Sequence, residues 1–189
     1  MGKRIVSSDL RRPTSREDVI IALKSERAYQ LRRWGFRQED GLMLEAEHDV
    51  YEWVTYIDDY LAEAKHFISR NEDRKAYDTA LDCLRKCVTM AIAAFEMRDI
   101  DPYKQIYTGY VRPPQTPMVA GVEWYLLRIQ GIINKYLQEM GSESTDSPMA
   151  RDAVLQSVID IGVVCFENYG ISPRDLTQPI TNGRDGQPA

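Results

Sequence analysis

Apolar residues recur at steps of three and four along two stretches of the chain, the spacing that places side chains on one face of an α-helix. In residues 44–68 these positions are Val50, Val54, Ile57, Leu61, Ala64 and Ile68. In residues 74–98 they are Leu81, Leu84, Val88, Ile92 and Phe95. Because only a short polar turn separates the stretches, they are predicted to form an antiparallel helical hairpin.

Helical patterns also occupy most of the remaining chain. A first helix is predicted to begin at Ser15, whose hydroxyl can cap free N–H groups, and to stop at Gly35. A second pair of helices is expected over residues 118–140 and 148–169. The connector over residues 99–117 holds several prolines and is expected to be non-helical. With almost no strand signal, the predicted fold class is all-α.

The two hairpins resemble each other in sequence. LRKCVTMAIAAFEMRDIDP begins at Leu84, and LQSVIDIGVVCFENYGISP begins at Leu155, 71 residues later (155 − 84). The same offset aligns Phe95-Glu96 with Phe166-Glu167. The preceding apolar stripes align better at 72, which pairs Val50, Val54, Ile57 and Leu61 with Val122, Leu126, Ile129 and Ile133. The pattern predicts an internal duplication that forms a four-helix core.

These patterns set the expected domain organisation. Residues 1–14 are predicted to be a flexible arm, and residues 15–189 a single all-α domain. Within that domain, repeat 1 covers about residues 44–102, repeat 2 about residues 117–173, and residues 174–189 form a C-terminal tail.

Composition narrows the classes of function. A net charge of −5 and a pI near 5.2 argue against nonspecific binding to nucleic acid. No stretch approaches the roughly 18 apolar residues of a membrane span, and no signal peptide is recognisable, so a soluble cytoplasmic protein is expected. The three cysteines are interpreted as small apolar residues within helices, in a reducing compartment.

Four carboxylates of the first hairpin form the candidate metal site. Asp59 and Glu63 lie four residues apart before the turn, and Asp78 and Asp82 lie four apart after it. They could meet across the hairpin and bind Mg²⁺ or Mn²⁺ through oxygen. In the alternative interpretation, these residues form a solvated charged face, with Asp82 paired to Arg85 or Lys86.

Two other groups carry candidate chemistry. Arg32 and Arg33 could bind phosphate oxygens while Trp34 stacks on a base, although a buried Trp34 with solvated arginines is the alternative. Acids also gather before the second helix, where the helix dipole alone favours them and His48 could add a metal ligand. These acids are Glu45, Glu47, Asp49 and Glu52.

Over residues 26–100, the stretches ERAYQLRRWG, EHDVYEWVTYIDDYLAEAKHFI and LDCLRKCVTMAIAAFE resemble phage-type members of the MazG-like group. That group comprises all-α nucleotide pyrophosphohydrolases. The resemblance implies a helical bundle, often dimeric or duplicated, which cleaves nucleoside triphosphates to monophosphate and pyrophosphate. It also implies Mg²⁺ bound by an E-x-x-E motif on one helix and an E-x-x-D motif on the next, and the cytoplasm of a bacterial host.

The chain departs from both motifs. The nearest matches to the first are Asp49-x-x-Glu52, or Asp58-Asp59 with Glu63. At the second, Asp82 takes the glutamate position, but Arg85 or Lys86 occupies the aspartate position. A cation there repels the metal ion that phosphoryl chemistry needs.

The hypothesis is therefore a nucleotide-handling protein, with Asp82 and Glu63 as catalytic residues if it is an enzyme. Two alternatives remain open. One is a non-catalytic protein that binds nucleotides. The other is a helical interaction module or homo-oligomer, with Trp53, Trp124 and Tyr125 in an intersubunit core.

Overall fold

The computed structural model describes residues 14–34, 48–70, 74–108, 121–140, 148–171, 181–182 and 187–188. The helices are α1 (Arg16–Trp34), α2 (Val50–Arg70), α3 (Arg74–Glu96), α4 (Pro102–Thr108), α5 (Val122–Met140) and α6 (Pro148–Tyr169). Two short strands, β1 (Thr181–Asn182) and β2 (Gln187–Pro188), pair antiparallel in the C-terminal tail. The predicted all-α class is confirmed.

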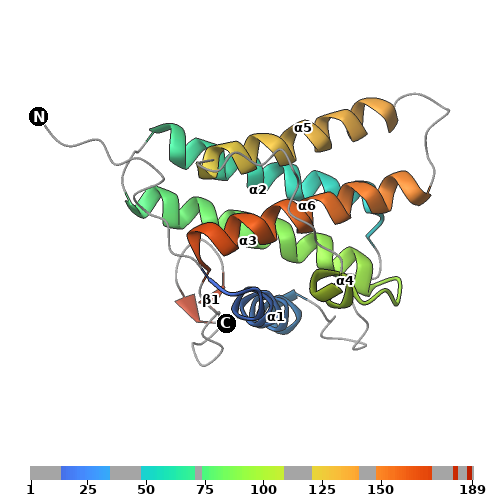
Figure 1. Ribbon diagram of the computed structural model, residues 1–189, viewed down its shortest axis with the longest axis horizontal. Coiled ribbons are helices and arrows are strands. Elements are labelled where there is room, and N and C mark those ends of the chain that lie inside the picture. Colours follow the sequence, from blue (N-terminus) through green and yellow to red (C-terminus); the bar gives the residue numbers. More distant parts are fainter. Residues whose placement is uncertain are drawn as a thin grey trace, which may run out of the picture.

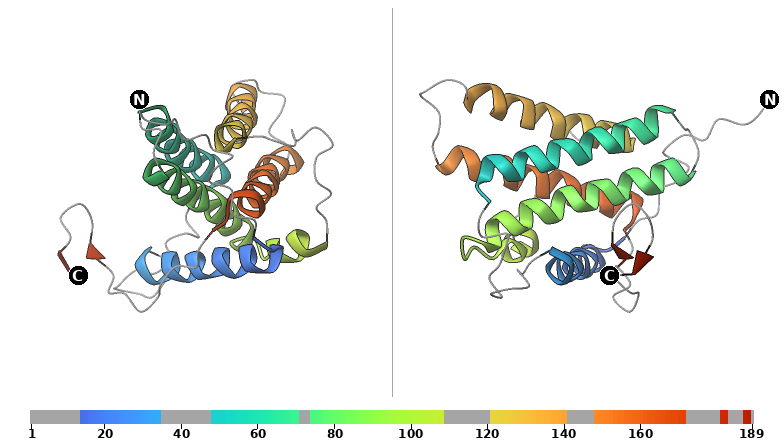
Figure 2. Two further views of the ribbon diagram at one scale, coloured as in Figure 1. Left: turned by 60° about the vertical axis from the view of Figure 1, so that its left-hand side comes forward. Right: turned by 180° about the vertical axis from the view of Figure 1, so that it is seen from behind.

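The two predicted hairpins pack against each other as a four-helix bundle. Helix α3 lies between α2 and α6, while α5 closes the bundle by contacting both α2 and α6 (Figure 1). Helix α1 crosses beneath α3 and α6, and is seen nearly end-on in Figure 1 and along its length in the left view of Figure 2. The short helix α4 lies beside α1 (Figure 2), and Lys24 Nζ of α1 is 4.9 Å from the centre of the Tyr103 ring.

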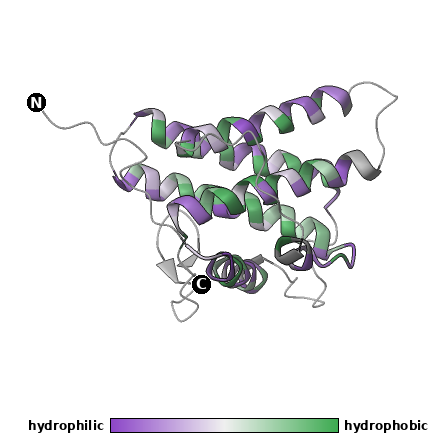
Figure 3. Ribbon diagram, viewed as in Figure 1, coloured by the Kyte–Doolittle hydropathy of each residue, from purple (hydrophilic) through white to green (hydrophobic). Residues whose placement is uncertain are grey.

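The apolar stripes predicted from the sequence form the core. Val54, Ile57 and Leu61 of α2 are fully buried, as are Ile129 and Ile133 of α5. Hydrophobic ribbon is concentrated in the middle of the molecule, where α3 and α6 meet (Figure 3). The buried positions of the two hairpins therefore correspond at the offsets seen in the sequence, although the duplication itself stays a prediction.

Helices α3 and α6 approach closely at one glycine. A Cβ atom placed on Gly162 of α6 would lie 2.2 Å from Cγ2 of Val88 on α3. Glycine is unfavourable inside a helix, by about 1 kcal/mol relative to alanine. The close approach of the two helices explains its presence here.

Polar caps start three of the helices. The Ser15 hydroxyl accepts a hydrogen bond from the Asp18 amide at 3.2 Å, so the predicted start of α1 is confirmed. The prediction of a non-helical connector is wrong for α4. Its first residue is Pro102, whose missing N–H costs nothing at that position, and Asp101 Oδ1 accepts hydrogen bonds from the next two amides at 2.9 and 3.3 Å.

The start of α2 is a reciprocal cap. Asp49 Oδ1 accepts a hydrogen bond from the Glu52 amide at 2.8 Å, and Glu52 Oε2 accepts one from the Asp49 amide at 2.9 Å. His48 Nδ1 lies 3.4 Å from the same Glu52 carboxylate. These acids, one candidate match to the first MazG-like motif, therefore stabilise a helix N-terminus.

Helices α3 and α6 end in the same way. Asp99 has a φ of 57° and Gly170 a φ of 86°, and the two residues are 71 apart (170 − 99). In each helix a buried phenylalanine, Phe95 or Phe166, lies four residues earlier. The Ile100 amide donates to the Phe95 carbonyl at 3.1 Å, and the Gly170 amide donates to the Phe166 carbonyl at 2.7 Å, so in each case the chain bonds back to the last turn of the helix.

Two expectations concern the whole chain. All three cysteines are free and buried, as interpreted from the sequence, and burial raises the pKa of the Cys83 thiol to about 12. Within the described residues, no helix combines the length and apolar character needed to cross a membrane.

Candidate functional site

The crossing of α1 and α3 buries charged side chains. Glu26 is 1% exposed, Arg27 3% and Arg85 7%. Burying an ionised group is costly unless an opposite charge and hydrogen bonds compensate it. Buried charged groups therefore indicate candidate functional sites.

Arg27 connects α1 to the C-terminal end of α3. Its Nε donates to Glu96 Oε2 at 3.0 Å, and its Nη1 donates to Gln30 Oε1 at 3.0 Å. Gln30 in turn donates from Nε2 to Thr89 Oγ1 at 2.7 Å. This side of the crossing is a closed network, which suits a structural role.

Arg85, one turn before Thr89 on α3, pairs with two acidic residues. Its Nε is 3.1 Å from Glu26 Oε2 on α1, and its Nη2 donates a hydrogen bond to Asp82 Oδ1, one turn earlier on α3. Glu26 lies inside the protein, whereas the Asp82 side chain is 37% exposed. The guanidinium thus connects a buried carboxylate to one at the surface.

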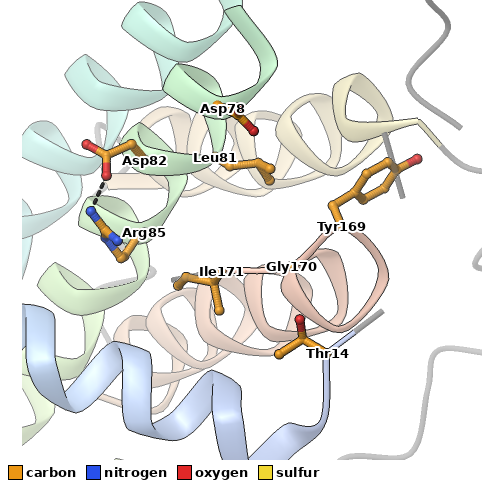
Figure 4. A pocket seen from close by; sticks show the side chains of 8 residues that line it. All are labelled: Thr14, Asp78, Leu81, Asp82, Arg85, Tyr169, Gly170 and Ile171. Atoms are coloured by element: carbon orange, nitrogen blue, oxygen red, sulfur yellow. Dashed lines mark hydrogen bonds and ion pairs between the residues drawn. The ribbon is translucent and has the colours of Figure 1, made fainter. Parts of the chain in front are cut away.

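A cavity of about 370 Å³ opens beside this ion pair (Figure 4). It lies between the N-terminal half of α3, the end of α6 and Thr14, two residues before α1. It is lined by Thr14, Asp78, Leu81, Asp82, Arg85, Tyr169, Gly170 and Ile171. The wall thus combines two carboxylates, one guanidinium and an apolar surface.

The backbone at the end of α6 shapes one side of the cavity. The Thr14 amide donates to the Glu167 carbonyl at 3.0 Å, and Arg16 Nε donates to Glu167 Oε1 at 2.8 Å. These bonds fasten the start of α1 to α6. Gly170, in its left-handed conformation, presents no side chain to the cavity.

The four predicted metal carboxylates do not gather at one point. Asp78 and Asp82 both line the cavity, but Asp59 is exposed on α2. Glu63 on α2 lies near the Cys83 thiol and accepts a hydrogen bond from it. Burial is the main reason why the pKa of this thiol is raised, and the negative charge of Glu63 is the second. Among the described residues, no three His, Cys, Asp or Glu side chains form a group that could share a metal ion.

The other predicted groups have different outcomes. Arg32 is exposed near the end of α1, and the side chains of Arg33 and Trp34 lie outside the described residues, so this nucleotide-binding prediction stays a prediction. Trp53 and Tyr125 are 5% and 1% exposed within this chain. They belong to its own core, which contradicts their proposed place in an intersubunit core.

The sequence interpretation missed Glu26 as a partner of Arg85. A signal was available, because the buried face of α1 begins with Val19 and Leu23 and continues at helical spacing through Glu26, Arg27 and Gln30. Charged residues that continue an apolar stripe predict buried ion pairs. Their partners on α3 cannot be identified without the fold.

Comparisons with known protein families, with curated proteins and with solved structures give no match.

Proposed function

We propose that the chain is a MazG-like nucleotide-handling protein that takes a nucleoside triphosphate, together with Mg²⁺ or Mn²⁺, into the cavity beside Arg85. The reaction proposed there is hydrolysis to monophosphate and pyrophosphate. The observation that carries this proposal is that Asp78, Asp82 and Arg85 all line one cavity of about 370 Å³. Small-molecule sites in proteins have volumes of about 300–1,000 Å³.

The charges on the wall favour a ligand that brings a cation. Asp78 and Asp82 outnumber Arg85, which already has a buried acidic partner in Glu26. A bound divalent cation would offset the charge of a triphosphate beside these carboxylates and strengthen its binding there. Proteins usually hold Mg²⁺ through one or two carboxylates plus the substrate's phosphates. Asp78 and Asp82, four residues apart on α3, fit that role without a larger cluster.

Other residues fit the remaining parts of a nucleotide. The planar guanidinium of Arg85 matches phosphate oxygens, which it can bind through two N–H groups. Leu81, Tyr169 and Ile171 supply an apolar wall for a base or sugar. The bound Mg²⁺ would neutralise the phosphates and lower the pKa of an attacking water.

The test is incubation with a panel of ribo- and deoxynucleoside triphosphates, with Mg²⁺ or Mn²⁺ and then with EDTA, followed by assay of monophosphate and pyrophosphate. Metal-dependent product is expected from one or a few nucleotides. Asp82→Asn should reduce turnover at least about 100-fold, as loss of a metal-binding or acid–base group typically does. The matched control is Asp59→Asn, on the exposed face of α2, which should retain it.

The second candidate is a protein that binds nucleotides without cleaving them. The pairing of Arg85 with Asp82 favours it, because a guanidinium beside this carboxylate opposes a metal ion. Binding without product across the whole panel would select this alternative. If no nucleotide of the panel bound and none gave product, both candidate functions would be contradicted.

A further inference from the structure

The two acidic partners of Arg85 differ in their access to solvent. Glu26 is 1% exposed and comes from α1, while the side chain of Asp82 is 37% exposed and borders the cavity. The Arg85 side chain between them is 9% exposed. Any ligand in the cavity can therefore compete with Asp82 for Arg85, but cannot reach Glu26.

The two ion pairs also differ in how readily they can exchange. A buried carboxylate that loses its cation pays a large desolvation penalty, so Glu26 holds Arg85 firmly. The Asp82 pair joins residues three apart on one helix, with a partly hydrated carboxylate, and such pairs contribute little to stability. A phosphate group, with more charge and more acceptor oxygens, is a stronger partner for a guanidinium.

We propose that Glu26 is a positioning residue that anchors Arg85 at the cavity wall, and that Asp82 occupies the place of a ligand phosphate until a phosphate-bearing ligand displaces it. The released Asp82 carboxylate then faces the cavity beside Asp78, where a cation that accompanies the phosphates can bind. This inference deepens the proposed function and rests on it for the natural ligand. The exchange itself requires only a phosphate anion.

The exchange can be followed on Arg85 directly. The full chain is labelled with ¹⁵N-arginine, and the Arg85 Nε–Hε signal is assigned by its loss in Arg85→Lys. Inorganic pyrophosphate is then added without metal. The Arg85 signal is expected to shift saturably, and about two- to fivefold less pyrophosphate should suffice in Asp82→Asn, where a neutral amide replaces the competing carboxylate. No saturable shift, or no gain in Asp82→Asn, would overturn the exchange.

Glu26→Gln separates positioning from simple electrostatics. Both Glu26→Gln and Asp82→Asn remove one negative charge near Arg85, so electrostatics alone would tighten pyrophosphate binding in both. If Glu26 positions Arg85, then Glu26→Gln weakens binding while Asp82→Asn tightens it. Equal tightening in the two variants would refute the positioning role.

A second variant guards against loss of folding. If circular dichroism shows that Glu26→Gln is unfolded, Glu26→Asp retains the charge but shortens its reach, and it should also weaken pyrophosphate binding. Unchanged affinity in Glu26→Asp would refute the anchor. A pyrophosphate-dependent shift of Arg85 without nucleotide binding would leave this inference standing and refute the proposed function. Nucleotide binding without a pyrophosphate-dependent shift of Arg85 would refute this inference and leave the proposed function standing.

Discussion

Two glycines within helices have opposite surroundings. Gly162 of α6 faces Val88 so closely that an added Cβ would lie 2.2 Å from Val88 Cγ2, whereas an added Cβ on Gly131 of α5 would meet nothing within 4 Å. Gly162→Ala is expected to destabilise the protein by about 1–3 kcal/mol, the usual cost of overpacking. Gly131→Ala should stabilise it by up to about 1 kcal/mol.

Urea unfolding of the two variants, followed by circular dichroism, measures this difference. The pair is matched because each variant adds one methyl group to a helix interior. A Gly162→Ala protein at least as stable as the wild type would mean that α3 and α6 pack further apart than described.

Asp160 on α6 makes stability depend on pH. Partial burial raises the pKa of this carboxyl, although a hydrogen bond from Gln156 and the charge of Arg16 act in the opposite direction. Since the folded-state pKa lies above the unfolded one, the protonated form favours folding, and this contribution is lost as the pH rises through the folded-state pKa. Asp160→Asn should therefore unfold at higher urea than the wild type at pH 7.

The same comparison below pH 3.8, the ordinary pKa of this group, supplies the control. There both proteins carry a neutral side chain at position 160, so the two midpoints should converge. A stabilisation that persists unchanged at low pH would show that the carboxylate charge is not its cause.

At the scale of elements, α1 joins the two hairpins at equivalent points. Arg16 pairs with Glu167 at 2.8 Å and Arg27 with Glu96 at 3.0 Å, and the two glutamates are 71 residues apart (167 − 96). The Phe-Glu dipeptide that recurs in the sequence thus makes equivalent contacts in both hairpins. Its phenylalanine is buried, and its glutamate accepts an arginine of α1.

The two arginines should contribute unequally. Arg27 is 3% exposed and also bonds to Gln30, so Arg27→Ala should destabilise the protein by about 2–3 kcal/mol because polar partners lose their donor. Arg16 is 27% exposed, and Arg16→Ala should cost less than about 1 kcal/mol. Urea unfolding measures both, and equal losses would contradict the difference in burial.

Helix positions were accessible from the sequence because apolar stripes and caps are local signals. The sequence predicts both the cap at Ser15 and a helix over Pro148–Tyr169. It does not predict α4, because a proline such as Pro102 usually indicates a break in a helix. Only its place directly after the capping residue Asp101 makes it a suitable first residue. Asp49 and Glu52 fitted both a cap and a metal motif. The hydrogen bonds between these two residues show that they cap α2.

The candidate site was less accessible. Asp78 and Asp82 were identified from their spacing, but the sequence also grouped them with Asp59 and Glu63, which are not among the residues that line the cavity. Glu26 and Arg85 are 59 residues apart (85 − 26), and nothing local links them. Their pairing follows from how α1 crosses α3, a tertiary feature that helical periodicity does not encode.

At the scale of the whole molecule, the cavity forms where three parts of the chain converge. Helix α3 supplies the charged wall, the end of α6 supplies Tyr169 and Gly170, and Thr14 before α1 completes the lining (Figure 4). One hairpin alone would lack the opposite wall. The account therefore predicts that ligand binding stabilises the assembled bundle as a unit.

Calorimetric titration of the whole chain with non-hydrolysable nucleoside triphosphate analogues, with Mg²⁺ and then with EDTA, tests directly whether the cavity beside Arg85 binds a metal–nucleotide complex. The account predicts saturable, Mg²⁺-dependent binding of one or a few analogues, and its loss when Asp78→Asn and Asp82→Asn are combined. Absence of binding across the panel, or binding that is indifferent both to Mg²⁺ and to the double substitution, would contradict a cavity built for a metal–nucleotide complex.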